Sequence, residues 1–267
     1  MAYTTHAYLI TCLTNLHVGS EGINYGVVDN LVQRDTISEI PVINSSSLKG
    51  ALREFFKDKW SETDPRLKYI FGPDGTRNTG SQAGIGHYKF FEAKLLSIPV
   101  RSNKEAFYSV TTKDIVENIN DLYSNLTNCE TKLINLICGD KKNEPEKGEL
   151  IESDKIVKLE DWSTRINQEF NADTKIGKNV ATFDTDTFKK VVKRLPVIAR
   201  NKLDNGTSKN LWYEEVVPRE SRFVFFVSET EEHFDDFENA FKDAVVQIGG
   251  NASIGCGYCK ITKIEKP

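Results

Sequence analysis

Residues 45–56, SSSLKGALREFF, decide the fold because they predict an amphipathic helix near the start of the chain. Serine is a preferred N-cap residue, so Ser45, Ser46 and Ser47 are candidates for the helix start. Behind them, four apolar residues recur at helical spacing: Leu48, Leu52, Phe55 and Phe56. This helix is therefore expected to bury one side in a core.

A second side of the same predicted helix is basic. Lys49, Arg53 and Lys57 lie four residues apart, so they share one face. Together with Ser46, Ser47 and the N–H groups at the helix start, Lys49 and Arg53 could bind phosphates. A basic face that only meets solvent is the alternative.

Gly50 lies inside this predicted helix, where glycine costs about 1 kcal/mol relative to alanine. Two explanations stay open. Either another backbone, such as a nucleic-acid strand, approaches the helix closely at this point, or the glycine allows tight helix packing.

The segments on both sides of this helix predict a sheet. Strands are expected at Ala7–His17, Phe90–Val100, Ala106–Val110, Arg222–Val227 and Tyr258–Ile264. Further helices are expected at Asp114–Leu126, Phe188–Val192 and Glu231–Val246, the last ended by Gly249 and Gly250. The order of these elements at the two ends of the chain predicts an α+β fold with a ferredoxin-like (RRM-like) core that carries insertions.

Two regions interrupt this predicted core. Leu195–Arg200 and Leu211–Val217 resemble strands, and between them lies Asn205-Gly206, a pair typical of a tight β-hairpin turn. The segment Cys129–Phe183 has weak periodicity and is rich in Lys, Glu, Asp and Asn. It predicts a variable insertion of short strands and loops.

The loop Gly26–Asp35 (GVVDNLVQRD) places two carboxylates and an arginine between the first strand and the basic helix. A carboxylate in such a loop, Asp29 or Asp35, can bind a divalent metal, orient a hydroxyl or act as a base. The alternative is structural, with Asp29 capping a turn and Asp35 paired with Arg34.

Residues 247–257, QIGGNASIGCG, are a glycine-rich stretch whose backbone N–H groups could bind phosphates. The candidate residues are Gly249, Gly250 and Gly255. No Gly-Lys-Ser/Thr follows, and the glycines do not open a helix as GxGxxG does. The stretch therefore argues against an ATP or dinucleotide site.

Three other features carry weaker signals. Cys256 and Cys259 form a CxxC pair. A redox pair opens a helix, whereas a strand follows this one, and no second close pair completes a zinc site, so neither a redox nor a zinc role is favoured.

His17 follows the first strand, where a lone histidine is usually structural. Glu214 and Glu215 are neighbours in a strand, so they are expected to face opposite sides.

The composition is that of a soluble globular protein, with 39% hydrophobic and 28% charged residues. Neither a membrane span nor a secretory signal is expected. The odd number of cysteines, five, indicates reduced thiols and a cytoplasmic location. A net charge of −4 argues mildly against nonspecific duplex binding but permits a local basic groove.

Taken together, the motifs resemble one family. They are TCLTNLHVGSEG (11–22), GVVDNLVQRD (26–35), IPVINSSSLKGALR (40–53), SIPVRSNKEAFYSVTT (97–112), LPVIARNKL (195–203), NLWYEEVVP (210–218) and QIGGNASIGCGYCKI (247–261). From about Tyr8 to Lys263 the chain resembles the RAMP superfamily, and within it the backbone subunit of the type III-B CRISPR effector, the Cmr complex. Asn15 and Asn251-Ala252-Ser253 depart from the usual pattern of that family.

The resemblance implies one RAMP domain over residues 1–267. It has a ferredoxin-like palm, a variable insertion at about 129–183 and a β-hairpin thumb at about 192–217. It also implies that copies of the chain stack along a guide crRNA, together with other type III effector subunits, and that single-stranded target RNA pairs with the guide. The target would be cut at regular intervals, beside bases that the thumb displaces.

For the site, the resemblance implies that Asp29 is catalytic and that the RNA's own 2′-OH is the attacking group. Mg²⁺ or another divalent metal would be required, and Asp29 could hold it. His17 and Glu215 match positions near the scissile phosphate. Lys49 and Arg53 would hold the guide backbone.

Three alternatives remain. The chain could be a noncatalytic scaffold that binds guide RNA while another subunit cuts. It could be the related backbone subunit of the type III-A complex. A guide-processing RAMP endonuclease is the third alternative, which the serine-lysine-arginine helix and the Asp29 loop disfavour.

Overall fold

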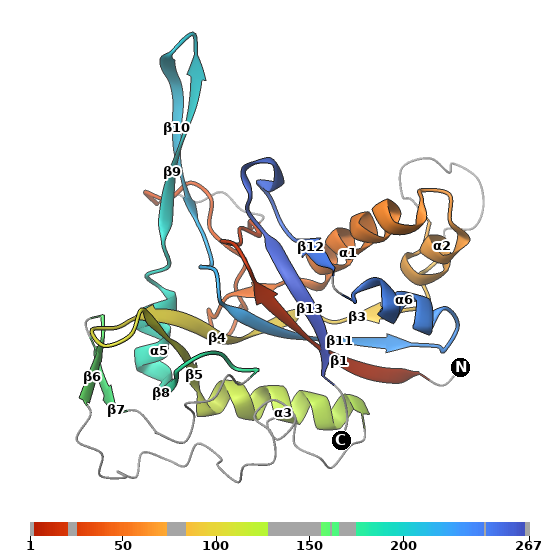
Figure 1. Ribbon diagram of the computed structural model, residues 1–267, viewed down its shortest axis with the longest axis horizontal. Helices are drawn as coiled ribbons and strands as arrows, with labels where there is room; N and C mark the ends of the chain where they lie inside the picture. The colour runs from red at the N-terminus through yellow and green to blue at the C-terminus, as the bar shows by residue number, and fades with distance from the viewer. Residues whose placement is uncertain are drawn as a thin grey trace.

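The structure is a computed structural model with one large sheet, helices on both of its faces and a projecting hairpin (Figure 1). It describes residues 3–20, 26–73, 84–127, 156–160, 162–165, 175–242 and 244–264.

The elements follow one another along the chain in an alternating α+β order. The strands are β1 (Thr4–Cys12), β2 (Val42–Ile43), β3 (Lys89–Phe90), β4 (Ala93–Arg101), β5 (Phe107–Thr112), β6 (Ile156–Leu159), β7 (Trp162–Arg165), β8 (Val180–Phe183), β9 (Val197–Asp204), β10 (Thr207–Glu215), β11 (Arg222–Glu229), β12 (Val245–Gln247) and β13 (Tyr258–Ile264). The helices are α1 (Ser45–Trp60), α2 (Pro65–Phe71), α3 (Lys113–Thr127), α5 (Thr185–Val192), α6 (Phe234–Ala240) and the 3-10 turn η2 (Ala252–Ile254).

The order of the central strands confirms the ferredoxin-like prediction. The large sheet runs β12-β13-β1-β11-β4-β5-β8. Its four central strands, β13-β1-β11-β4, are antiparallel neighbours. In chain order they are the fourth, first, third and second strands of a β-α-β-β-α-β unit, in which α1 follows β1 and α6 follows β11.

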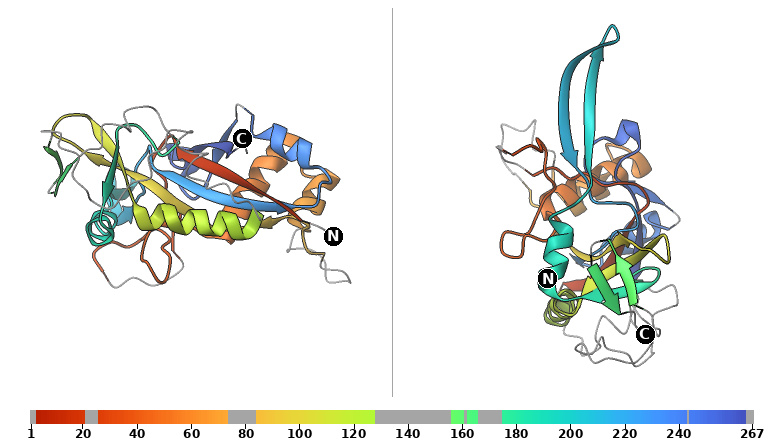
Figure 2. Two further views of the ribbon diagram at one scale, coloured as in Figure 1. Left: turned by 90° about the horizontal axis from the view of Figure 1, so that it is seen from below. Right: turned by 90° about the vertical axis from the view of Figure 1, so that its left-hand side faces the viewer.

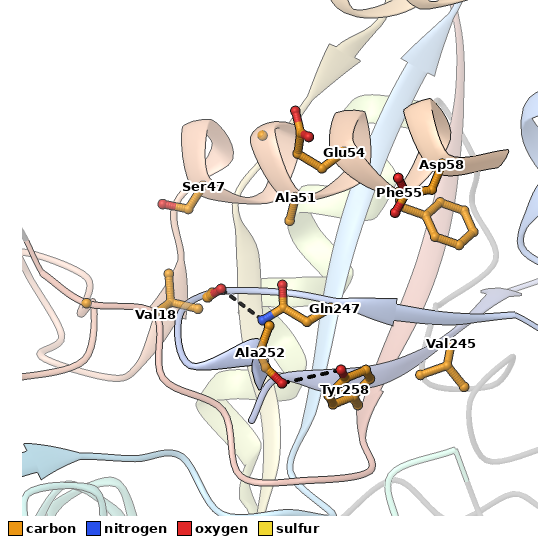
Figure 3. A pocket seen from close by; sticks show the side chains of 13 residues that line it. Val18, Ser47, Ala51, Glu54, Phe55, Asp58, Val245, Gln247, Ala252 and Tyr258 are labelled. Carbon is orange, nitrogen blue, oxygen red and sulfur yellow. Dashed lines mark hydrogen bonds between the residues drawn. The ribbon is translucent and has the colours of Figure 1, made fainter. Parts of the chain in front are cut away.

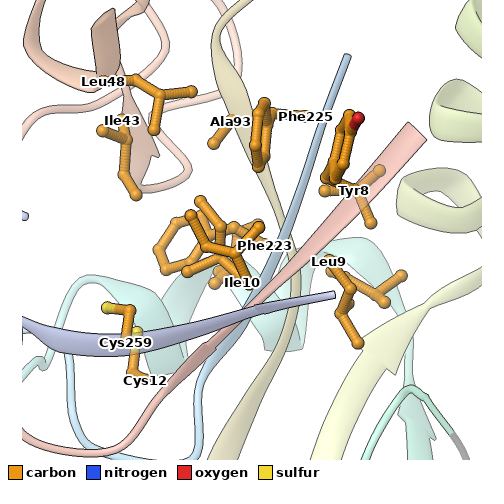
Figure 4. Close-up of a cluster of buried hydrophobic side chains, with 14 of the residues drawn as sticks. Tyr8, Leu9, Ile10, Cys12, Ile43, Leu48, Ala93, Phe223, Phe225 and Cys259 are labelled. Carbon is orange, nitrogen blue, oxygen red and sulfur yellow. The ribbon is translucent and has the colours of Figure 1, made fainter. Parts of the chain in front are cut away.

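The two innermost strands, β1 and β11, are buried on both faces, which explains their apolar runs Ala7–Ile10 and Phe223–Val227. Tyr8 on β1 packs against Phe237 and Phe241 of the α6 region, with ring centroids 6.4 and 5.9 Å away. On the opposite face, Phe226 of β11 lies 6.2 Å from Tyr123 of α3. Figure 4 shows part of this core, which includes Ile10, Phe223 and Leu48. Because both faces are covered along these runs, polar and apolar residues do not alternate in them, whereas β13 alternates between exposed and buried residues.

The predicted hairpin is present as β9 and β10, which stand out from the rest of the molecule (Figures 1 and 2). Asp204 pairs with Thr207, so Asn205-Gly206 is a two-residue turn. Both turn residues have positive φ, 49° and 77°. This is the geometry for which Asn-Gly is favoured, because its twist matches that of the flanking strands.

The helix predicted over Glu231–Val246 is wrong in its second half. α6 ends at Ala240, and Val245–Gln247 form strand β12, which pairs with Tyr258–Lys260 of β13. Gly249 and Gly250 therefore follow a strand and do not end a helix. Edge pairing with β13 overrides the helical spacing of the aromatic residues.

Several other boundaries differ from the sequence prediction. β1 ends at Cys12 rather than at His17, and a two-residue break separates β3 from β4. The N-cap of α1 is Asn44, without a side-chain cap bond, so the three serines form the first turn of the helix instead of capping it. Most of the predicted insertion lies outside the described residues, but its end, β8, is a parallel neighbour of β5.

Candidate functional site

Asp29 is fixed at the base of the hairpin by the backbone of Tyr213. Its Oδ2 atom accepts a hydrogen bond from the Tyr213 N–H at 2.7 Å, and its own N–H donates to the Tyr213 carbonyl at 3.0 Å. Asn30 also donates to that carbonyl, at 3.1 Å. Asp29 itself is exposed, and its Oδ1 atom accepts no hydrogen bond within the described part of the chain. The loop thus presents one carboxylate oxygen to solvent beside the hairpin.

Glu215, two residues further along β10 than Tyr213, anchors the same loop through its side chain. Its carboxylate accepts hydrogen bonds from the Val32 N–H at 3.1 Å and from the Arg34 guanidinium at 2.6 Å. The side chain is only 5% exposed. Both carboxylate oxygens are therefore engaged by the protein, which gives Glu215 an anchoring contact. Its predicted place near a scissile phosphate stays a prediction.

The structural alternative predicted for this loop is wrong in one contact. Arg34 does not pair with Asp35, because its guanidinium bonds to Glu215 and to the carbonyls of Glu39 and Val192. Asp35 instead caps a turn, and it accepts a hydrogen bond from the Ser38 N–H at 2.7 Å. This bond is the largest cause that lowers the pKa of Asp35.

His17 is buried beside the same base. Its Nδ1 atom lies 2.7 Å from the Glu215 carbonyl oxygen, so this nitrogen carries the proton and donates it. The His17 carbonyl accepts a hydrogen bond from the Gly250 N–H at 2.8 Å. The structure thus brings together His17, Asp29, Glu215 and the glycine-rich stretch, although no side-chain contact joins the three predicted catalytic residues in the described part of the chain.

Glu214 faces away from Glu215, as the strand alternation predicts. Its Oε1 atom accepts from the Trp212 indole at 2.9 Å, and its Oε2 atom accepts from Arg200 at 3.0 Å and from the Asn251 amide at 2.8 Å. Arg200 also reaches the Cys256 sulfur at 3.5 Å. Sequence reasoning gave no role to Arg200 or Trp212, because nothing in a local pattern shows which carboxylate they meet.

The three candidate glycines of the 247–257 stretch differ in what an added side chain would meet. A Cβ on Gly249 would lie 2.3 Å from the His17 carbonyl oxygen, and its φ is +82°. Gly249 is therefore required by the protein itself. Gly255 also has a positive φ, +81°, but a Cβ there would meet no atom within 4 Å in the described part of the chain. A Cβ on Gly250 would make only an ordinary contact, at 3.9 Å from His17.

A cavity of about 690 Å³ separates α1 from the glycine-rich stretch (Figure 3). Ser47 and Gly50 line it from α1, and Gly249 lines it from the opposite side. A Cβ on Gly50 would meet nothing within 4 Å among the described residues, so packing inside this chain does not explain the glycine. Among the described residues that line the cavity, the charged ones are Glu54 and Asp58, so the charge on its wall is negative.

The predicted basic face of α1 is partly occupied. Arg53 donates to the Gly72 carbonyl at 2.7 Å, and Lys57 lies 3.5 Å from Glu54. Lys49 is half-buried, and burial followed by the charge of Arg53 lowers its pKa. Of the two serines predicted to bind RNA, Ser46 is exposed, whereas Ser47 accepts a hydrogen bond from Gln33 at 2.9 Å. Lys49 and Ser46 are thus the more accessible candidates for phosphate contacts.

Gln33 is a residue that sequence reasoning missed. Its amide nitrogen donates to Ser47 and to the Gly19 carbonyl, and its amide oxygen accepts from the Asn44 N–H at 2.8 Å. The side chain therefore ties the Asp29 loop to the start of α1. A glutamine in a loop carries no sequence signal for such a role.

A metal site is not prebuilt in the described residues, which contain no cluster of three His, Cys, Asp or Glu side chains that could hold an ion. Asp29 offers one free carboxylate oxygen, while Glu214 and Glu215 are engaged by protein donors. Mg²⁺ is commonly held by one or two carboxylates together with phosphate oxygens and water. Asp29 alone fits such an ion only when RNA and water supply the other ligands.

Two further expectations are reduced cysteines and the absence of a membrane span. Cys12, Cys256 and Cys259 are free and buried, while Cys129 and Cys138 lie outside the described residues. Among the helices of the described ranges, none has the length and apolar character that a membrane crossing requires.

The sequence pattern of the RAMP superfamily matches residues 9–260. The chain belongs to the RAMP superfamily. It is also 31% identical, over 97% of its length and 96% of the relative's length, to the CRISPR system Cmr endoribonuclease Cmr4 of Pyrococcus furiosus. This relative places the chain in the Cmr4 family and confirms the resemblance drawn from the motifs.

Solved RAMP structures share the fold. A chain of the type III-B Cmr-beta complex bound to cognate target RNA aligns with a TM-score of 0.78 and 22% identity, and 97% of each chain is covered. Oligomeric Cmr4 from Pyrococcus furiosus aligns with a TM-score of 0.66 and 22% identity, over 99% of this chain and 100% of the other. These likenesses confirm the palm predicted from the sequence.

Proposed function

We propose that this RAMP protein is a backbone subunit of a type III-B CRISPR effector, that it binds guide crRNA and that it cuts the paired target RNA. The relationship to an endoribonuclease over 97% of the chain supports the class of activity. The exposed carboxylate of Asp29, held rigidly at the base of a projecting hairpin, is the observation that carries the assignment to this subunit.

The reaction is cleavage of single-stranded target RNA by its own 2′-OH, which leaves a 5′-hydroxyl and a 2′,3′-cyclic phosphate. The nucleophile belongs to the substrate, so the protein needs only to align it with the phosphate and assist proton transfer. Asp29 is the group placed to do so. His17, buried behind the loop, holds the Glu215 backbone, and we assign it a supporting role near the phosphate.

A divalent metal, Mg²⁺ in the simplest case, would offset the charge of the scissile phosphate. Asp29 would supply one oxygen to it, and the RNA and water would supply the remaining ligands. No other free carboxylate lies beside Asp29 at the hairpin base among the described residues, because Glu214 and Glu215 are engaged.

Guide RNA would lie along α1 and the glycine-rich stretch. Lys49 and Ser46 are accessible at the start of α1, and Gly50 leaves an open approach beside them. Gly255 offers a second unobstructed backbone, while Gly249 and Gly250 shape the loop around His17. Contacts of this kind are to phosphates and not to bases, which suits a subunit that must accept any guide sequence.

The hairpin β9–β10 would act as the thumb of this subunit, beside which the target is cut. Copies of the chain would stack along the guide with other type III-B subunits, in the cytoplasm. The identity to Cmr4 favours this assignment over a type III-A subunit.

The decisive experiment is cleavage of target RNA by the complex reconstituted with guide crRNA and Mg²⁺. Asp29→Asn keeps an oxygen for the Tyr213 N–H but removes the charge, and Asp29→Ala removes both. We expect both variants to lower the cleavage rate by about 10²-fold or more, the usual contribution of an acid–base group, with assembly intact.

Asp121→Asn is the matched control, because Asp121 is an exposed carboxylate on α3. Its cleavage should equal that of the wild type. If the Asp29 variants also cut at the wild-type rate, this subunit is a scaffold and another subunit carries the nuclease.

A further inference from the structure

We propose that Glu214 is a positioning residue for target cleavage, which fixes Asp29 relative to the glycine-rich stretch without touching RNA. The inference rests on the proposed function, in which Asp29 acts at the scissile phosphate. Glu214 is only 5% exposed, so a nucleic acid has almost no surface of this side chain to meet. Its carboxylate is used entirely within the protein.

The carboxylate joins three parts of the chain at one point. Trp212 donates to it from the same strand at 2.9 Å, and Arg200 donates from the neighbouring strand β9 at 3.0 Å. Asn251 donates from the glycine-rich stretch at 2.8 Å. Asn251 is held at a positive φ of 65°, next to Gly250, whose N–H binds the His17 carbonyl. Glu214 therefore links the hairpin to the glycine-rich stretch through Asn251, beside the longer contact from Arg200 to the Cys256 sulfur at 3.5 Å.

The residues around Glu214 favour the ionised form of its carboxylate. Burial by itself raises the pKa of Glu214, but the hydrogen bonds from Trp212 and Arg200 and the nearby His17 outweigh it and leave the pKa lowered. A carboxylate that accepts several N–H groups in a buried site is held firmly, because each bond to a charged acceptor is strong and each lost partner is costly.

Glu214 acts on Asp29 through the backbone of the residue before it. Tyr213 directly precedes Glu214, and its backbone N–H and C=O are the groups that hold Asp29. The Tyr213 carbonyl shares a peptide unit with the Glu214 nitrogen, so a backbone displacement at Glu214 also displaces a group that binds Asp29. A misplacement of about 1 Å can lower an enzymatic rate by about 10²-fold, so a residue that makes no contact with substrate can still set the rate.

Two variants test this role in the reconstituted complex. Glu214→Gln keeps the shape, but its amide group cannot accept on both sides, so one set of donors loses its partner. Asn251→Gly removes only the contact from the glycine-rich stretch, and glycine tolerates the positive φ. We expect the single-turnover cleavage rate to fall about 10- to 100-fold for Glu214→Gln and by a smaller factor, above about threefold, for Asn251→Gly.

Three readouts separate positioning from other roles. The Kd for target RNA should stay within about twofold of wild type, the cuts should stay at the same spacing, and the plot of log rate against pH should shift down without a change of shape. Glu117 is an exposed carboxylate on α3 that pairs with Lys113, and Glu117→Gln should cut like the wild type.

The remaining outcomes overturn the proposal. Wild-type rates in both variants would mean that this link does not set the rate, and a loss of target binding or assembly that accounts for the loss of rate would mean a structural role only. A changed pH profile would mean that Glu214 exchanges protons itself. If the complex does not assemble with Glu214→Gln, the cleavage rate of Asn251→Gly tests the proposal. Wild-type cutting by Asp29→Ala would instead refute the proposed function, so the two failures are distinguishable.

Discussion

The substitution Gly249→Ala tests how the glycine-rich stretch is built. Gly249 has a φ of +82°, and a Cβ there would lie 2.3 Å from the carbonyl oxygen of His17. That same carbonyl accepts the hydrogen bond from the Gly250 N–H at 2.8 Å. The added methyl group therefore meets rigid backbone and must displace a bond that holds the stretch against His17.

The magnitude follows from these contacts. A residue with a Cβ costs about 1–2 kcal/mol in the left-handed region. Loss of the bond between Gly250 and His17 adds about 0.5–1.5 kcal/mol, and the displacement of backbone adds strain. The free energy of unfolding should fall by about 2–4 kcal/mol, a decrease in Tm on the order of 10 °C for a chain of this size.

Two neighbouring glycines are matched controls in the same thermal unfolding assay. Gly255→Ala carries the positive φ but meets open space, so it should lose only about 1–2 kcal/mol. Gly250→Ala makes an ordinary contact at 3.9 Å and should stay within about 0.5 kcal/mol of the wild type. Equal losses for Gly249→Ala and Gly255→Ala would refute the reasoning, because the contact with His17 is the difference between them.

Three further predictions concern charge. Burial lowers the pKa of His6 in the folded protein. The free energy of unfolding should therefore decrease as the pH falls below the unfolded pKa of about 6.5. In unfolding curves recorded from pH 8 to 5, His6→Gln should flatten this dependence. Lys49→Ala should weaken guide-RNA binding in a titration and reduce the slope of log K against log salt by about 1. Arg53→Ala should weaken binding in the same way and should also lower Tm, because it removes the hydrogen bond from Arg53 to the Gly72 carbonyl. Arg34→Ala should cost about 2–3 kcal/mol in denaturant unfolding, because it leaves the Glu215 carboxylate buried without its partner, and a loss below 0.5 kcal/mol would contradict this.

The core of the fold could be predicted because its determinants are local. The apolar stripe of α1 and the apolar runs of β1 and β11 are each visible within about ten residues, and Asn205-Gly206 specifies its own turn. The order of these elements along the chain then predicted the ferredoxin-like core, and the family resemblance implied the same palm.

The failure at Glu231–Val246 shows the limit of periodicity. Phe234, Phe237, Phe241 and Val245 do recur at helical spacing, but Phe241 is the C-cap of α6. Val245 lies opposite Lys260 in the edge strand β12. The strand that pairs with Val245–Gln247 follows only after the glycine-rich stretch, 11 to 15 positions further along the chain, so the spacing of apolar residues within 231–246 does not reveal it.

Sequence reasoning could name candidate residues for the site but could not predict the contacts between them. The motif match singled out Asp29, and strand alternation separated Glu214 from Glu215. The contacts that give these residues their roles span the chain, because Asp29 binds Tyr213 across 184 positions and Glu215 binds Val32 across 183. Such pairs become neighbours only once the hairpin has been placed on the sheet.

The two adjacent glutamates explain how a projecting hairpin can be rigid at its base. An isolated two-stranded ribbon is only marginally stable in water, so β9–β10 needs support where it leaves the sheet. Glu215 ties it to the Asp29 loop through Val32 and Arg34, and Glu214 ties its other face to the glycine-rich stretch through Asn251. Because alternation sends neighbouring side chains to opposite faces, one dipeptide holds the ribbon on both sides. The two buried glutamates thus serve the structure, which supports the proposal that Asp29, exposed at the hairpin base, takes part in the chemistry.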